Sequence, residues 1–166
     1  MDDPLARAEY DDQEAARERY EAFTDYRIAG NLDATAENLR LMGFADAGAV
    51  LDRTADVAVT IGDTDMAQSH LLGGAADQWR TVAHDLDEQT KATGQSYVAG
   101  AEGQAAADTA PHAASDAEKT RLEALAAAAG AAQTALQHRA ADLGHDAQAA
   151  AKQAAADESM ARGLDR

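Results

Sequence analysis

The side chains best placed to do chemistry are three polar residues toward the C-terminal end of the chain: His138, Asp142 and His145. Their spacings of four and three residues would bring them to one face of an α-helix, where imidazole and carboxylate groups can hold a divalent metal ion. The same helical geometry turns them away from the leucines of this segment, so we expect them to face solvent. An ordinary hydrated polar face is therefore favoured over a weak or intermolecular metal site.

No other set of residues has the spacing of a catalytic centre. A polar cluster covers residues 84–88, but a ferritin-like di-iron bundle requires Glu-x-x-His pairs, and no glutamate precedes a histidine by three places. Ser69 and His70 are adjacent, so their side chains diverge, and no serine lies in a Gly-x-Ser-x-Gly turn. The chain has no cysteine, which excludes disulfides, thiol catalysis and cysteine-bound zinc. We predict neither enzymatic activity nor a cofactor.

The composition favours helices that pack through small side chains. Among the 166 residues there are 45 alanines, whereas leucine, isoleucine, valine and phenylalanine together number 22. Alanine is the best helix former, and only two prolines interrupt the chain. The predicted fold class is all-α: a helical bundle or extended helical hairpin followed by a long alanine-rich C-terminal helix.

The net charge of −16 bears on possible partners. A chain this acidic repels phosphate backbones, so nucleic-acid binding is not expected. No window approaches the 18 apolar residues of a membrane-spanning helix, and the acidic start Met1-Asp2-Asp3-Pro4 does not resemble a Sec signal peptide. These features leave the cytoplasm, a virion, or export without a cleaved signal as the possible locations.

Local signals divide the chain into residues 1–100, a flexible connector over 101–114, and an alanine-rich helical segment over 115–166. Asp3 and Pro4 are typical of a helix start, and Ser115 followed by Glu118 has the spacing of a capping box. Glycines at 30, 43 and 62 predict stops. The expected helices cover residues 4–28, 32–42, 50–61, 65–100 and 116–162.

Apolar side chains at helical spacing predict the packing faces. Tyr20 and Phe23 belong to a stripe of the first helix, Val50, Val57 and Ile61 form a second stripe, and Leu72, Ala76 and Trp79 begin a third. The stripe of the C-terminal segment contains Leu122, Leu125, Ala129, Ala132, Leu136, Leu143, Ala147, Ala150 and Ala154. Trp79, the only tryptophan, is interpreted as a core anchor, with contact to a partner helix as the alternative. The residues expected to bind a protein partner are Trp79, Leu86, Tyr97, Leu122, Leu125, Leu136 and Leu143.

Residues 50–102 resemble the Trp-X-Gly helical-hairpin proteins of type VII secretion systems. The resemblance depends on one helix, a turn at Gly62, Trp79 early in the next helix, and Tyr97 followed by Glu102. In that family a tyrosine with an acid four places later is part of the export signal, whereas here the acid is five places later. The family glycine is also absent, since Trp79 is followed by Arg80 and Thr81. The resemblance implies a small exported helical protein.

Together these patterns predict a non-catalytic interaction or assembly protein that binds a protein partner or copies of itself through its helices. A type VII-like secreted protein is one form of this hypothesis. A structural, adaptor or scaffold component of a phage-like particle is an alternative form. A small-molecule or metal-binding helical bundle is an alternative of a different class.

Overall fold

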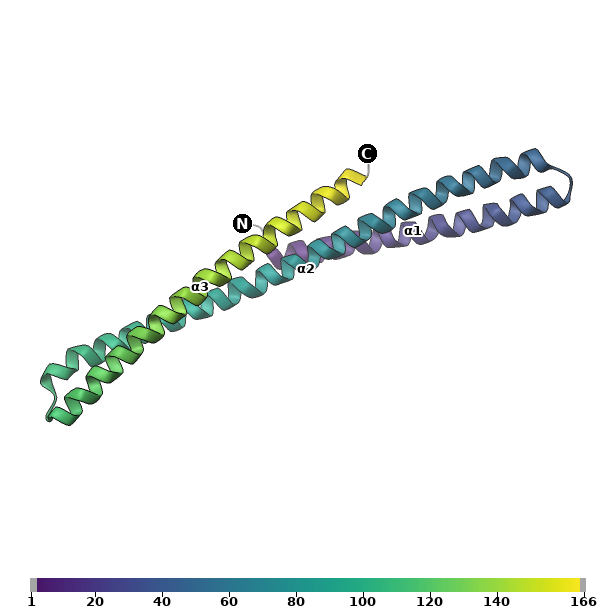
Figure 1. Ribbon diagram of the computed structural model, residues 1–166. Coiled ribbons are helices and arrows are strands. Elements are labelled where there is room, and N and C mark those ends of the chain that lie inside the picture. Colours follow the sequence, from purple (N-terminus) through teal and green to yellow (C-terminus); the bar gives the residue numbers. More distant parts are fainter. Residues whose placement is uncertain (1–2, 165–166) are drawn as a thin grey trace. The chain divides into compact units, whose positions relative to one another are not determined.

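The computed structural model describes residues 3–164, and they form three long helices (Figure 1). Helix α1 covers Pro4–Leu41, α2 covers Ala45–Thr109 and α3 covers Asp116–Leu164, with a short 3-10 turn, Ala110–His112, before α3. No strand occurs in this part of the chain. The prediction of an all-α protein with a long C-terminal helix is confirmed.

The helix boundaries follow from local chemistry. The Asp3 side chain accepts a hydrogen bond from the Leu5 backbone N–H at 3.0 Å, which caps α1 as predicted. Gly43, with φ of +89°, makes the turn between α1 and α2 in a backbone conformation that favours glycine. At the start of α3, the Ser115 hydroxyl accepts from the Glu118 N–H at 3.2 Å, and the Glu118 carboxylate accepts from the Ala114 N–H at 2.9 Å.

Several predicted interruptions are wrong. Gly30 lies inside α1, and Gly62 lies inside α2, so the turn on which the Trp-X-Gly resemblance depended does not exist. The connector expected over 101–114 is helical as far as Thr109. A glycine inside a helix costs only about 1 kcal/mol relative to alanine, and the packing of a long helix face exceeds that cost.

The chain packs as two compact units, which are described separately. The first, called unit 1, contains the residues up to Arg80 together with those from Ala151 onward. The second, called unit 2, contains residues 81–150. The packing therefore groups the C-terminal end of α3 with α1, although the two segments lie at opposite ends of the sequence.

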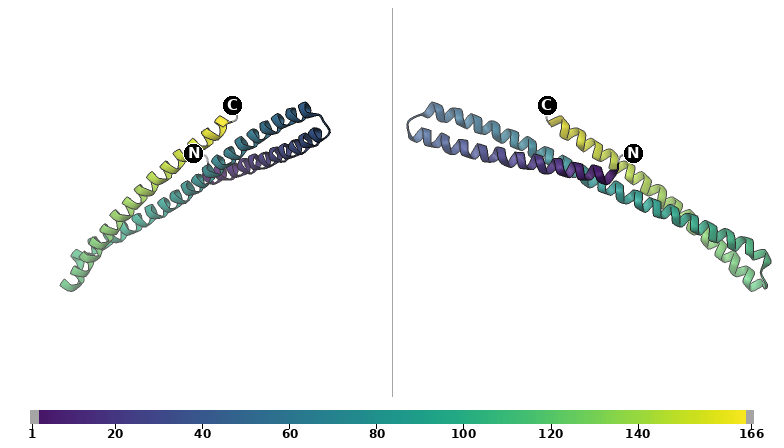
Figure 2. Two further views of the ribbon diagram at one scale, coloured as in Figure 1. Left: turned by 45° about the vertical axis from the view of Figure 1, so that its right-hand side comes forward. Right: turned by 180° about the vertical axis from the view of Figure 1, so that it is seen from behind.

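In unit 1, α1 and the first part of α2 pack against each other through small residues (Figure 2). The Ala22 carbonyl oxygen lies 3.2 Å from where a Cβ on Gly62 would be, and that of Ala36 lies 2.9 Å from the corresponding point on Gly48. These contacts define an antiparallel register in which one small residue faces another every seven positions. The small residues are Ala8, Ala15, Ala22, Ala29 and Ala36 in α1, and Gly48, Ala55, Gly62, Ser69 and Ala76 in α2.

The stripes predicted over residues 4–28 and 50–61 are therefore turned the wrong way, whereas Leu72, Ala76 and Trp79 of the stripe predicted over 65–100 are buried. Tyr20, Phe23, Val50, Val57 and Ile61 are all exposed, because the alanine and glycine positions already occupy the interface. Two helices with small residues at every seventh position approach more closely than large side chains would allow. Between these two segments the core follows the small side chains, and the large side chains of the two stripes are left outside.

In unit 2, the remainder of α2 packs against the first part of α3 (Figure 2). A Cβ on Gly103 would lie 3.0 Å from the Ala129 Cβ, and one on Gly100 would meet the Gln133 side chain. The stripe predicted for α3 is largely confirmed, whereas Leu125 and Ala132 are exposed. The members of that stripe that are buried or half-buried in unit 2 are Leu122, Ala129, Leu136, Leu143, Ala147 and Ala150.

Candidate functional site

The single tryptophan is the centre of a polar network in unit 1. Trp79 is buried, as predicted for a core anchor, and its indole Nε1–H donates to Glu158 Oε1 at 2.8 Å. The Arg7 guanidinium lies over the indole ring, 4.3 Å from the ring centroid, in a cation–π contact. Trp79 thereby joins α1, α2 and the C-terminal end of α3.

Glu158 is a buried carboxylate whose charge is compensated. Only 5% of this residue is exposed, and its Oε2 accepts from Arg162 at 2.7 Å and from Arg7 at 3.3 Å. With the indole N–H, three donors surround one carboxylate. A buried charge is tolerated when it is both paired and hydrogen-bonded in this way.

Asp11 lies close to this network but lacks a comparable set of donors. The residue is 3% exposed, and its Oδ2 has no hydrogen-bond partner. Burial, reinforced by the nearby negative charge of Glu158, raises the pKa of the Asp11 carboxyl to about 6. At neutral pH the site therefore contains a mostly ionised carboxylate with an unfilled acceptor position.

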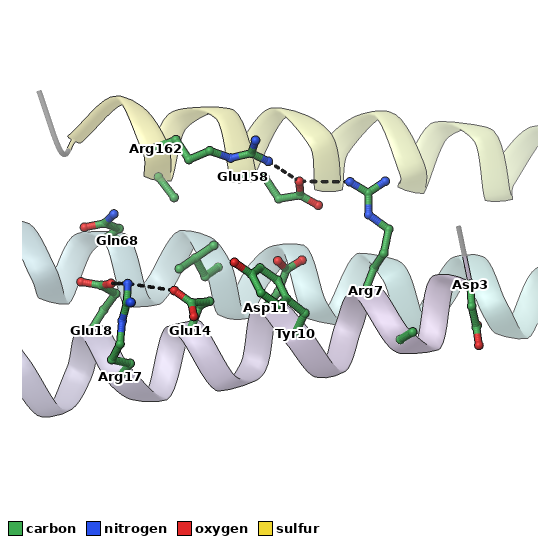
Figure 3. A pocket seen from close by; sticks show the side chains of 13 residues that line it. Asp3, Arg7, Tyr10, Asp11, Glu14, Arg17, Glu18, Gln68, Glu158 and Arg162 are labelled. Atoms are coloured by element: carbon green, nitrogen blue, oxygen red, sulfur yellow. Dashed lines mark hydrogen bonds and ion pairs between the residues drawn. The ribbon is translucent and has the colours of Figure 1, made fainter. Parts of the chain in front are cut away.

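A cavity of about 460 Å³ opens beside Asp11, with walls from all three helices of unit 1 (Figure 3). On one wall, Arg17 pairs with Glu18 at 2.6 Å and with Glu14 at 2.8 Å. The charged side chains that line the cavity are the acids Asp3, Asp11, Glu14, Glu18 and Glu158 and the bases Arg7, Arg17 and Arg162. Acids outnumber bases, so the cavity favours a positively charged occupant.

The histidine cluster predicted as a low-probability metal site does not form one. His138, Asp142 and His145 are all exposed, as the helical geometry predicted. Across residues 3–164, no group of three or more histidine, aspartate or glutamate side chains is arranged to hold a metal ion.

A second candidate is the apolar turn between α1 and α2. Leu41, Met42 and Phe44 are 76%, 69% and 57% exposed, and we call these three residues the apolar tip. Val50 is also exposed one to two helical turns beyond it. Three consecutive large apolar side chains around Gly43, all in solvent, are typical of a surface that another molecule covers.

The predicted partner-binding residues differ in their accessibility. Tyr97 is 77% exposed, and Leu125 is also exposed, so both are available on the surface of unit 2. Leu86 is half-buried in α2. Of the other four, Trp79 is buried, and Leu122, Leu136 and Leu143 are half-buried where α3 packs on α2.

Sequence reasoning missed Asp11, Glu158 and the apolar tip as functional candidates. A weak signal for the acids existed: each lies on the same helix face as buried alanines, Asp11 following Ala8 by three residues and Glu158 following Ala154 by four. A charged residue on a buried stripe requires a partner or a ligand.

Comparisons with known proteins identify no relative: no family model, no curated protein and no solved structure matches this chain. None of the helices over residues 3–164 has an apolar stretch long enough to cross a membrane.

Proposed function

We propose that this chain is a non-catalytic helical interaction or assembly protein that binds a protein partner, or another copy of itself, through exposed apolar side chains. The observation that carries the proposal is where side chains of different size lie: many of the large apolar ones are exposed, and small ones are buried. Small residues fill the helix–helix interfaces, while Leu41, Met42, Phe44, Tyr20 and Phe23 remain in solvent. Large apolar side chains contribute most binding energy when a partner buries them.

The apolar tip is the strongest part of this surface. Burying a side chain such as Leu, Met or Phe contributes about 1.5–3 kcal/mol when it leaves water completely. The three side chains lie around a turn held by backbone hydrogen bonds, from the Gly43 N–H to the Arg40 carbonyl at 3.0 Å and from the Phe44 N–H to the Leu39 carbonyl at 2.8 Å, so little backbone freedom remains to be lost on binding. The tip is therefore a preorganised apolar anchor.

The test replaces the tip and measures association. The triple variant Leu41→Ser, Met42→Ser, Phe44→Ser removes the apolar side chains, and Val57→Ser, Val59→Ser, Ile61→Ser, at three exposed positions of α2, is the matched control. Light scattering reports self-association, and a photo-crosslinking residue at the exposed position 45, which no variant changes, reports a partner in the producing cell. We expect oligomers or a crosslinked partner with the wild type and the control, and neither with the tip variant. A wild-type monomer without any crosslinked product contradicts the proposal.

Two narrower forms of the proposal differ in the expected assembly. Export by a type VII-like system is supported by the exposure of Tyr97 and Glu102 on α2, where a secretion receptor can reach both. A monomer or a one-to-one heterodimer favours that form. A ring or large oligomer favours a scaffold component of a phage-like particle.

A further inference from the structure

The wall of the cavity of unit 1 contains a buried carboxylate, Asp11, with an oxygen, Oδ2, to which none of residues 3–164 donates a hydrogen bond. The nearest cations are engaged elsewhere: Arg7 and Arg162 bind Glu158, and Arg17 binds Glu14 and Glu18. Leaving a buried acceptor unsatisfied costs free energy, so such a group calls for an external donor.

We propose that this cavity binds a primary ammonium group, with Asp11 as its counter-ion. An ammonium is a compact cation with three N–H donors, so it can pair with the Asp11 carboxylate while its other donors reach water or neighbouring acceptors. Tyr10 lines the same cavity and lies beside Asp11, so its ring is available to an alkylammonium (Figure 3).

The geometry favours an ammonium over other cations. A divalent metal ion needs several oxygen or nitrogen ligands, and residues 3–164 offer no such group. The space of about 460 Å³ is within the range of small-molecule sites and is much larger than a bare ion requires. Protonation of Asp11 also competes only weakly with ammonium binding above pH 6, because the pKa of Asp11 is about 6.

Two sources can supply a primary ammonium: a free alkylamine, or a lysine side chain of another protein. Both would insert an aliphatic chain that ends in the charged group, past the apolar wall that Leu72 and Ala161 provide. This site lies in the three-helix part of unit 1 and does not involve the apolar tip. It therefore does not depend on the proposed function.

The experiment titrates the full chain with cadaverine, near pH 7.5, and in parallel with an acetylated tripeptide amide that has one central lysine. Trp79 is the only tryptophan and is hydrogen-bonded to Glu158 on the cavity wall, so its fluorescence reports binding directly. Calorimetry provides the affinity. The diol that matches cadaverine, and sodium chloride at equal ionic strength, control for chain length and for screening of the net charge.

We expect saturable binding of at least one amine and none of the diol. Asp11→Asn should weaken that binding about tenfold or more, since it removes the charge of the acceptor. The control Asp33→Asn changes an exposed aspartate of the same helix by the same chemistry, and should leave the affinity unchanged. Circular dichroism verifies that both variants are as helical as the wild type.

The relative affinities identify the source. Tighter binding of cadaverine indicates a free amine, and tighter binding of the tripeptide indicates a lysine of a partner. If neither amine binds saturably, or if Asp11→Asn binds as tightly as Asp33→Asn, the site does not exist.

Discussion

Within unit 1 and within unit 2, the helices pack against each other through different kinds of residue. In unit 1, small residues every seven positions bring α1 and α2 together, and the C-terminal end of α3 adds the buried Trp79–Glu158 network. In unit 2, two helix segments pack with half-buried leucines among the alanines, and residues 81–150 contain no counterpart of that network. The interior of unit 1 is therefore more polar.

The difference shows which residues determine how one helix is positioned against another. Alanine contacts release little free energy per residue, because an alanine buries little apolar area. In unit 1 the hydrogen bonds and ion pairs of Glu158 fix the position of the C-terminal end of α3. In unit 2 an exposed ion pair, Arg139 with Glu88 at 3.0 Å, joins α3 to α2 beside close contacts such as Gly103 with Ala129.

The largest effect is expected from filling the small-residue interface. Ala22 is completely buried, so Ala22→Leu forces α1 and α2 apart and should lower the free energy of unfolding by about 2–3 kcal/mol. Ala16→Leu is the matched control, because Ala16 lies on the exposed face of the same helix. Urea unfolding followed by Trp79 fluorescence reports unit 1. Equal stability of the two variants would mean that the interface is not close-packed.

Removing the indole donor should have the next largest effect. Trp79→Phe keeps a ring but leaves Glu158 Oε1 without the 2.8 Å hydrogen bond, so we expect a loss of about 1–2 kcal/mol. Tyr97→Phe removes a hydroxyl from an exposed ring of unit 2 and should change the stability by less than about 0.5 kcal/mol. Thermal unfolding by circular dichroism measures both. Similar losses would show that the network adds no stability to unit 1.

Asp11 gives unit 1 a pH dependence of opposite sign to that of Glu88 in unit 2, whose pKa is lowered by its hydrogen bond with Lys91. The pKa of Asp11 is about 6 in the folded chain and 3.8 as the reference value, so the ionised form is disfavoured by folding. The penalty is fully present above about pH 6 and disappears as the pH falls toward 4. Asp11→Asn should therefore raise the free energy of unfolding by about 1 kcal/mol at neutral pH, and by progressively less in acid.

Urea unfolding of the wild type and of Asp11→Asn at several pH values measures this difference. Asp33→Asn serves as the control, because Asp33 is exposed on α1. A difference between wild type and Asp11→Asn that stays constant from neutral pH to pH 4 would contradict the assignment.

The smallest effects should come from glycines that face open space in each unit. A Cβ added at Gly30 in unit 1 or at Gly130 in unit 2 meets no atom within 4 Å. Gly30→Ala and Gly130→Ala should each raise the free energy of unfolding by about 0.5–1 kcal/mol, because alanine loses less backbone entropy in a helix. Differential unfolding in urea checks both. A destabilisation at either position would reveal a contact absent from this structure.

Sequence patterns predicted unit 2 better than unit 1, for a physical reason. In α3 the leucines at 122, 136 and 143 lie on the same stripe as the buried alanines, so large residues mark the packing face. In α1 the packing face contains the five alanines from Ala8 to Ala36, while Tyr20 and Phe23 point outward. A prediction that follows the largest apolar side chains finds the first face and misses the second.

The candidate sites were only partly predictable. The burial of Trp79 was correct, and the outward direction of His138, Asp142 and His145 was also correct. The cavity was not predicted, because Asp11 and Glu158 are 147 positions apart and meet only when α3 returns to α1.

The amino-acid sequence alone determined the helical class, the caps at Asp3 and Ser115, and the turn at Gly43. Each of these depends on the conformational preference of a residue and its immediate neighbours, which the chain carries wherever it folds. Tertiary structure alone decided that Gly62 continues a helix and that the small residues lie inside. It also decided that a buried aspartate faces a cavity, since these outcomes depend on which distant segments meet and how closely their backbones approach.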